Sequence, residues 1–229
     1  RSFRGRIFRR FSRIIAVNSQ MKDLFRRYGV PDERIAIAAP YSLAPPDEST
    51  VVPPGLLAFF DEHSPVFVAV GGLENEYQPL LLVSAMDRIL EDFPDAGLII
   101  VGDGTLRTKT ERAILEGGHE GRIHVSGSID HELSLHLMRR ADAMIRSSLF
   151  DGDAISIREA MFLGTPVVAT DTGYRPEGIQ LFSIGDVNGL VEQLNSVVAA
   201  GRKITALPPA DVSNIATVVD LYEELSRSA

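Results

Sequence analysis

The chain of 229 residues contains no cysteine and no hydrophobic run long enough to cross a membrane. The absence of cysteine excludes disulfides, thiolate metal sites and cysteine nucleophiles. A membrane-spanning helix needs about twenty consecutive apolar residues, and no signal peptide is visible. Hydrophobic residues make up 45% of the chain and charged residues 24%, which is typical of a soluble globular protein. We therefore expect a cytoplasmic protein that buries a substantial core.

Several catalytic signatures with fixed spacing are also missing. The sequence contains neither a P-loop nor a nucleophile elbow. Its five histidines lack metal-ligand spacing: His131 and His136 are five residues apart, whereas two ligands on one helix face are four apart. We expect the histidines to have surface or capping roles.

Positive charge is concentrated at the N-terminus. Residues 1–40 carry a net charge of +7 and the remainder −15, within a total of −8. Phe3, Ile7 and Phe11 lie at helical spacing among the arginines. Such a helix can bind an anionic membrane peripherally, but we favour a domain helix whose phenylalanines face a core that this fragment lacks. The acidic body argues against nucleic-acid binding.

The chain reads as two structured parts joined by a linker. It begins at Arg1 inside a predicted helix, so we expect a longer protein. Residues 1–40 are predicted to end a preceding α/β domain, through a strand, a helix and a strand at 13–17, 20–28 and 35–39. The proline-rich segment 41–64 is the predicted linker, and residues 65–229 form the main domain.

The main domain alternates apolar strands with helices. Four near-continuous apolar runs indicate strands that are covered on both faces: 66–70, 98–101, 143–145 and 166–169. Two weaker strands are predicted at 122–125 and 179–182. Helices are predicted between the strands and after the last one, at 79–93, 106–116, 131–139, 154–163 and 186–199. This pattern predicts a doubly wound, Rossmann-like α/β fold with a parallel sheet.

In such a sheet, ligands bind beyond the carboxyl ends of the strands. These ends are predicted at Gly71-Gly72, Gly102–Gly104, 147–152 and 171–175. The Gly102-Asp103-Gly104 turn lacks the third glycine of the dinucleotide fingerprint. We therefore favour a tight turn that lines the cleft over direct phosphate contact.

The segment from Asp151 to Asp171 carries two acids around the start of a helix. Asp151 lies in a glycine-containing loop, where it can reach a sugar hydroxyl, and Glu159 lies two turns into the following helix, where it can hold a ribose. The helix start between them offers unpaired N–H groups to a diphosphate. Glu159 sits among apolar residues, so it must be solvated, paired or used. The alternatives are pairing with Arg158 and simple exposure on a solvated face; we favour a functional role.

Asp151 and Asp153 also resemble the acid-x-acid pair that holds a divalent ion in other transferases. Three residues are a frequent accidental match. Asp153 is better explained as the N-cap of a helix that starts at Ala154, accepting from the Ser156 N–H. We therefore expect no metal at this pair.

From about Ile14 to Val198 the chain resembles the C-terminal part of the retaining GT-B glycosyltransferases, a family with an acid-x7-acid motif. The resemblance rests on landmarks in order: Ile14–Ser19, Phe67–Leu73, Ala96–Gly104, Arg122–Gly127 and Glu159–Asp171. It implies that a sugar is transferred from a nucleotide diphosphate donor, with retention of configuration and without a metal, to a saccharide or lipid-linked acceptor. Asp151 and Glu159 would be the catalytic pair, contacting donor sugar and ribose.

The chain departs from this family where cations contact the donor phosphates. Gly72 and Tyr77 stand where an arginine and a lysine are usual, and Asp151 is one methylene shorter than the usual glutamate. We expect Arg146, Arg158 and Arg175 to form an alternative clamp for the diphosphate. Together with them, the expected donor-binding positions are Gly71, Gly72, Gly152, Asp153 and Ala154.

Two other functions remain open. The missing cations favour a non-catalytic domain that binds nucleotide sugars or acts as a scaffold, and another GT-B enzyme, such as a sugar epimerase, is a third possibility. Acceptor recognition in two-domain transferases lies mostly in the N-terminal half, so this chain alone should be inactive in transfer.

Overall fold

The computed structural model describes residues 3–202 and 206–227 and divides into two compact units. The first unit comprises Arg1–Ala44 and Pro209–Ala229, and the second comprises Pro45–Pro208.

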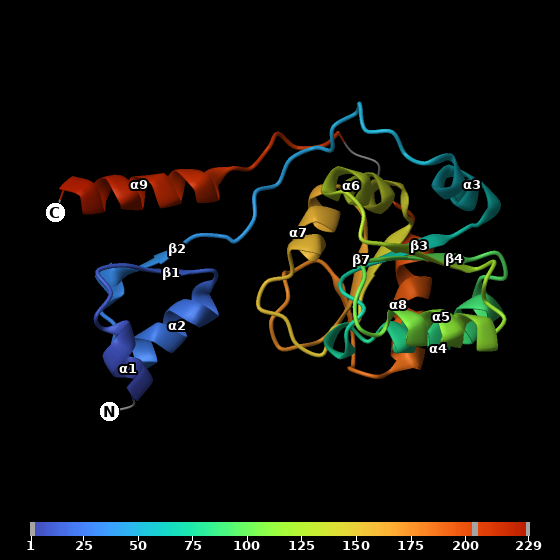
Figure 1. Ribbon diagram of the computed structural model, residues 1–229, viewed down its shortest axis with the longest axis horizontal. Coiled ribbons are helices and arrows are strands. Elements are labelled where there is room, and N and C mark those ends of the chain that lie inside the picture. The colour runs from blue at the N-terminus through green and yellow to red at the C-terminus, as the bar shows by residue number, and fades with distance from the viewer. Residues whose placement is uncertain (1–2, 203–205, 228–229) are drawn as a thin grey trace. The chain divides into compact units, whose positions relative to one another are not determined.

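The second unit is built on a parallel sheet of six strands (Figure 1). The strands are β3 (Val66–Val70), β4 (Gly97–Val101), β5 (Ile123–Gly127), β6 (Ala143–Arg146), β7 (Val167–Thr170) and β8 (Gln180–Phe182). Their order is β5-β4-β3-β6-β7-β8, so the chain winds outward in both directions from β3. The sheet confirms the predicted doubly wound fold, and its topological switch point lies between β3 and β6.

Helices cover both faces of this sheet. One face is covered by α4 (Pro79–Asp92), α5 (Arg107–Glu116) and α8 (Val187–Ala200). The other is covered by α3 (Pro54–Glu62), α6 (His131–Arg140) and α7 (Ile155–Phe162). Alternate residues of one strand belong to opposite cores: Phe67 packs with the first group, and Val66 and Val68 with the second. This alternation explains the continuous apolar runs in the sequence.

The predicted strands and helices of residues 13–200 are present, with ends that differ by at most two residues from the prediction. The linker prediction for residues 41–64 is wrong in part. Helix α3 begins at Pro54, since proline is tolerated in the first turn, and Leu56 is only 7% exposed within the core. The tail from residue 209 falls in the first unit rather than with the main domain.

The first unit is small. It contains α1 (Phe3–Phe8), β1 (Ile14–Ala16), α2 (Ser19–Arg27), a 3-10 turn (η1, Asp32–Arg34), β2 (Ile35–Ile37) and α9 (Ser213–Arg227). Strands β1 and β2 pair in parallel. The helix α9 was not predicted; its segment is joined to the unit by mutual backbone hydrogen bonds of 2.9 and 2.7 Å between Leu43 and Asp211.

The basic N-terminal helix divides its aromatic residues between core and solvent. Phe8 packs edge-on against Phe25, whereas Phe3 is 76% exposed. Phe8 therefore belongs to the core of this unit, whereas a core outside the chain and peripheral membrane binding both stay predictions. Within residues 3–202 and 206–227, no helix is both long and apolar enough to span a bilayer.

We predict that Leu56→Ala lowers the free energy of unfolding by about 2 to 3 kcal/mol, because it leaves a cavity beneath α3. Val51→Ala is the matched control, since Val51 is 82% exposed in the same segment and its truncation should cost less than about 0.5 kcal/mol. Urea denaturation of both variants measures the difference. Equal, negligible effects would contradict a structural role for α3.

Candidate functional site

The residues predicted to bind ligand gather at the carboxyl ends of β3, β6 and β7. Gly71 and Gly72 follow β3, and Arg146 ends β6. The loop from Asp151 to Ala154 leads into α7, and Arg175 lies in the segment after β7. These elements meet at the topological switch point, where open α/β sheets bind ligands.

The Asp151 carboxylate lies between two arginines. Arg146 donates through Nε to Oδ2 at 3.0 Å and through Nη2 to Oδ1 at 2.8 Å. Arg175 donates through Nη1 to Oδ2 at 2.8 Å, and the Ser148 hydroxyl donates to the same oxygen. Oδ2 thus accepts three of these hydrogen bonds and Oδ1 accepts one, which leaves acceptor capacity on Oδ1 alone. The group of one acid and two arginines carries a net charge of +1.

Burial by itself would raise the pKa of the Asp151 carboxyl, because it disfavours the charged form. The hydrogen bonds from Arg146 and Ser148, the charge of Arg146 and the hydrogen bond from Arg175 outweigh this effect. Together they lower the pKa of Asp151 from 3.8 to about 2. The carboxylate is ionised at neutral pH.

The two arginines also tie neighbouring strand ends together. Arg146 Nη1 donates to the Val70 carbonyl at 2.7 Å, and Arg175 Nε donates to the Thr170 carbonyl at 2.8 Å. Their side chains are only 10% and 3% exposed, respectively. The cluster thus connects the ends of β3, β6 and β7 through charged side chains.

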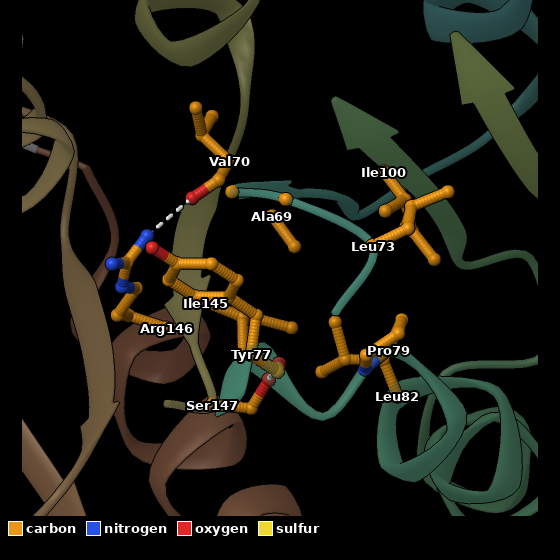
Figure 2. A pocket seen from close by; sticks show the side chains of 12 residues that line it. Ala69, Val70, Leu73, Tyr77, Pro79, Leu82, Ile100, Ile145, Arg146 and Ser147 are labelled. Carbon is orange, nitrogen blue, oxygen red and sulfur yellow. Dashed lines mark hydrogen bonds between the residues drawn. The ribbon is translucent and has the colours of Figure 1, made fainter. Parts of the chain in front are cut away.

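Tyr77 occupies the space beside the two glycines that follow β3. A Cβ added to Gly71 or Gly72 would lie 3.3 Å from the Tyr77 ring. The Arg146 guanidinium lies 4.6 Å from the centre of that ring (Figure 2), a cation–π distance. The cavity lined by these residues measures about 20 Å³, room for a single water. A diphosphate does not fit there in this conformation.

The start of α7 has no side-chain cap. Ala154 occupies the N-cap position, and the first N–H groups of a helix have no intrahelical partner. The predicted cap is wrong: Asp153 instead pairs with Arg158, whose Nε lies 2.9 Å from Oδ1. The charged guanidinium is the stronger partner for the carboxylate. The buried Ser156 hydroxyl, in the first turn, has no hydrogen-bond partner among the described residues.

Glu159 pairs with a histidine of the neighbouring helix. Its side chain is 10% exposed, and Oε1 lies 2.7 Å from His131 Nε2. His131 begins α6 and is 63% exposed, so the predicted surface position holds. Sequence reasoning missed this contact; the signal available was that α6 and α7 would be neighbours on one face of a doubly wound sheet.

The geometry requires glycine at Gly102 but leaves open space around Gly152. Gly102 has φ of +142°, and a Cβ there would lie 1.9 Å from the Gly71 carbonyl oxygen. Close approach of the two strand ends therefore requires glycine, as expected for a tight turn. Gly152 has no atom within 4 Å of an added Cβ. In the described parts of the chain, no three His, Asp or Glu side chains are arranged to hold a metal ion.

We predict that Asp151→Asn destabilises the protein most at neutral pH. Because the pKa of Asp151 is lower in the folded protein than in the unfolded chain, its charge stabilises the fold above pH about 4, by about 2 kcal/mol. This stabilisation is lost between pH about 4 and 2, so the curves of wild type and variant should converge there.

Urea denaturation across this pH range provides the measurement. Asp61→Asn, at an exposed aspartate on α3, is the matched control and should follow the wild type throughout. A constant difference between wild type and Asp151→Asn from pH 7 to pH 2 would contradict the ion cluster.

Comparison with known proteins agrees with the fold. The family model "Glycosyl transferases group 1" matches residues 58–208, about two thirds of the chain. An uncharacterized glycosyltransferase of Methanocaldococcus jannaschii is 28% identical over 114 residues, which cover 50% of this chain and 28% of that protein. The lipopolysaccharide 1,6-galactosyltransferase of Salmonella typhimurium is 24% identical over 200 residues, covering 82% and 53% of the two chains.

Solved structures show the same fold. The Anabaena protein HepE, crystallised with UDP and glucose, superposes with a TM-score of 0.65 at 18% identity. The match covers 84% of this chain and 55% of HepE. The match thus spans about half the length of the Salmonella enzyme and of HepE, and less than a third of the Methanocaldococcus protein. The family match and the shared fold together establish that the chain belongs to the glycosyl transferases group 1 family, with the GT-B fold.

Proposed function

We propose that the chain is the donor-binding part of a retaining glycosyltransferase that uses a nucleoside diphosphate sugar. The observation that carries this proposal is the uncapped start of α7, where the buried Ser156 hydroxyl has no partner within the described residues. Helix N-termini bind phosphate groups through free N–H groups and the helix dipole. The co-crystallised UDP and glucose of HepE, a protein of the same fold, support this class of ligand.

Arg158 is the cation best placed to reach a diphosphate at this position. It lies in the first turns of α7 and, with a side chain 24% exposed, is more accessible than Arg146 or Arg175. The diphosphate would compete with Asp153 for the guanidinium. Arg146 and Arg175 add the net positive charge of their cluster, which favours the developing charge of the leaving group without a metal.

The two acids keep separate proposed roles. Glu159 would hold the ribose, and Asp151 would contact the donor sugar near its reacting carbon. Because Oδ2 already accepts three hydrogen bonds and Oδ1 accepts one, a sugar hydroxyl would donate to Oδ1 or replace a partner of Oδ2. A bound diphosphate favours such a replacement, since it offers the arginines another anion.

The engaged Asp151 also supports a second candidate function. A domain that binds a nucleotide sugar without turnover needs no free acid at the sugar, and it tolerates the absence of cations at Gly72 and Tyr77. Under the first proposal, the saccharide or lipid-linked acceptor binds mainly to the rest of the longer protein, where the catalytic cleft is completed.

Calorimetric titration of the chain with a panel of nucleoside diphosphate sugars tests the proposal. We expect the sugar nucleotides of one base to bind with a Kd in the micromolar range. The full-length protein should in addition hydrolyse the bound donor slowly. Binding without hydrolysis or transfer to any acceptor would favour the second candidate. No binding by any member of the panel would contradict both.

We predict that Arg158→Ala weakens binding of the preferred nucleoside diphosphate by about tenfold, the effect of losing one charge-assisted hydrogen bond. Arg158→Lys keeps the charge and should lose less. Arg88→Ala on α4 is the matched control, since Arg88 pairs with Glu91 of its own helix. An unchanged Kd for Arg158→Ala, measured by calorimetry, would exclude Arg158 from the diphosphate site.

A further inference from the structure

The contact between His131 and Glu159 joins two helices at the candidate site. Glu159 is largely buried, and an ionised carboxylate in such a position is costly unless it is hydrogen-bonded. His131 Nε2 lies 2.7 Å from Oε1. Because a carboxylate only accepts hydrogen bonds, Nε2 carries the proton and donates it. This bond fixes one oxygen of Glu159 and leaves Oε2 for another donor.

Helix α6, which carries His131, is fixed by an N-terminal cap and by core packing. The Asp130 side chain caps α6 by accepting from the Glu132 N–H at 2.9 Å. Leu137 and Met138 are fully buried in the same core as Ile157 of α7. The distance between the start of α6 and the middle of α7 is therefore set by packing rather than by the side-chain contact.

Residues on the outer side of α6 also contact the segment that contains Asp47 and Glu48. Glu132 accepts from the Asp47 N–H at 2.8 Å, and His136 Nε2 lies 2.9 Å from the Asp47 carbonyl oxygen. Arg139 pairs with Glu48 at 2.7 Å. With both sides of the helix held, His131 can orient Glu159 without a large loss of entropy on binding.

We infer that His131 is a positioning residue for ribose recognition, acting through Glu159. This inference rests on the proposed function, in which Glu159 holds the ribose hydroxyls. A carboxylate fixed in one rotamer accepts well from hydroxyls at fixed positions, and a ligand that lacks one hydroxyl leaves an acceptor unpaired. A carboxylate free to rotate discriminates less. His131 therefore sets the preference for ribose over 2′-deoxyribose.

The test is calorimetric titration of the chain with UDP, ADP, GDP and CDP and with their 2′-deoxy counterparts. We expect the wild type to bind the preferred ribonucleotide about tenfold or more tightly than its deoxy form, the effect of one hydrogen bond to a charged group. His131→Ala should reduce this ratio to about twofold or less by weakening the ribonucleotide. The affinity for the deoxy form should change little.

Two further variants separate positioning from general structural effects. His131→Gln places an amide donor near the same point and should restore the ratio, whereas His124→Ala, on β5 rather than α6, should leave it unchanged. In a Glu159→Gln background, His131→Ala should have no additional effect on the ratio, because its action depends on the carboxylate. Thermal unfolding checks that each variant folds.

The possible results separate the role of His131 from the proposed function on which it rests. If the wild type binds nucleotides but His131→Ala keeps the full preference, or if the wild type shows no preference, the role of His131 is overturned and the proposed function stands. If no nucleoside diphosphate binds the wild type, both are overturned.

Discussion

The ion cluster of Asp151 with Arg146 and Arg175 is the interaction on which the candidate site depends. It lies where β3, β6 and β7 end, and it joins their ends through side chains that are almost fully buried. Removing the acid alone would leave two buried cations without compensation, which is more costly than never having built the pair. The cluster therefore fixes the shape of the sheet edge from which the functional loops project.

The same cluster explains how this chain differs from the usual pattern of the family it resembles. The sites of the expected cations carry Gly72 and Tyr77, and the tyrosine ring fills the space and packs on Arg146. Positive charge is thereby moved from the end of β3 toward β6, β7 and the start of α7. We propose that the diphosphate therefore binds at the uncapped start of α7, with Arg158 as its most accessible cationic partner.

The sequence was sufficient for the fold because each strand is a short apolar run between helices of regular spacing, a local signal. It failed for α3, where Pro53-Pro54 was interpreted as a break although proline can begin a helix. For the candidate site, the sequence indicated which residues take part but not which of them form pairs. Asp153 with Arg158 and Glu159 with His131 are contacts decided by rotamers and helix packing, which no local pattern contains.

A crystal structure of the chain bound to its preferred nucleoside diphosphate would show directly where the diphosphate lies. We expect phosphate oxygens at the first N–H groups of α7, within hydrogen-bonding distance of the Ser156 hydroxyl and the Arg158 guanidinium, and ribose hydroxyls at Glu159. A diphosphate bound elsewhere, with the start of α7 left open and the Arg158 pair with Asp153 unchanged, would contradict this proposal.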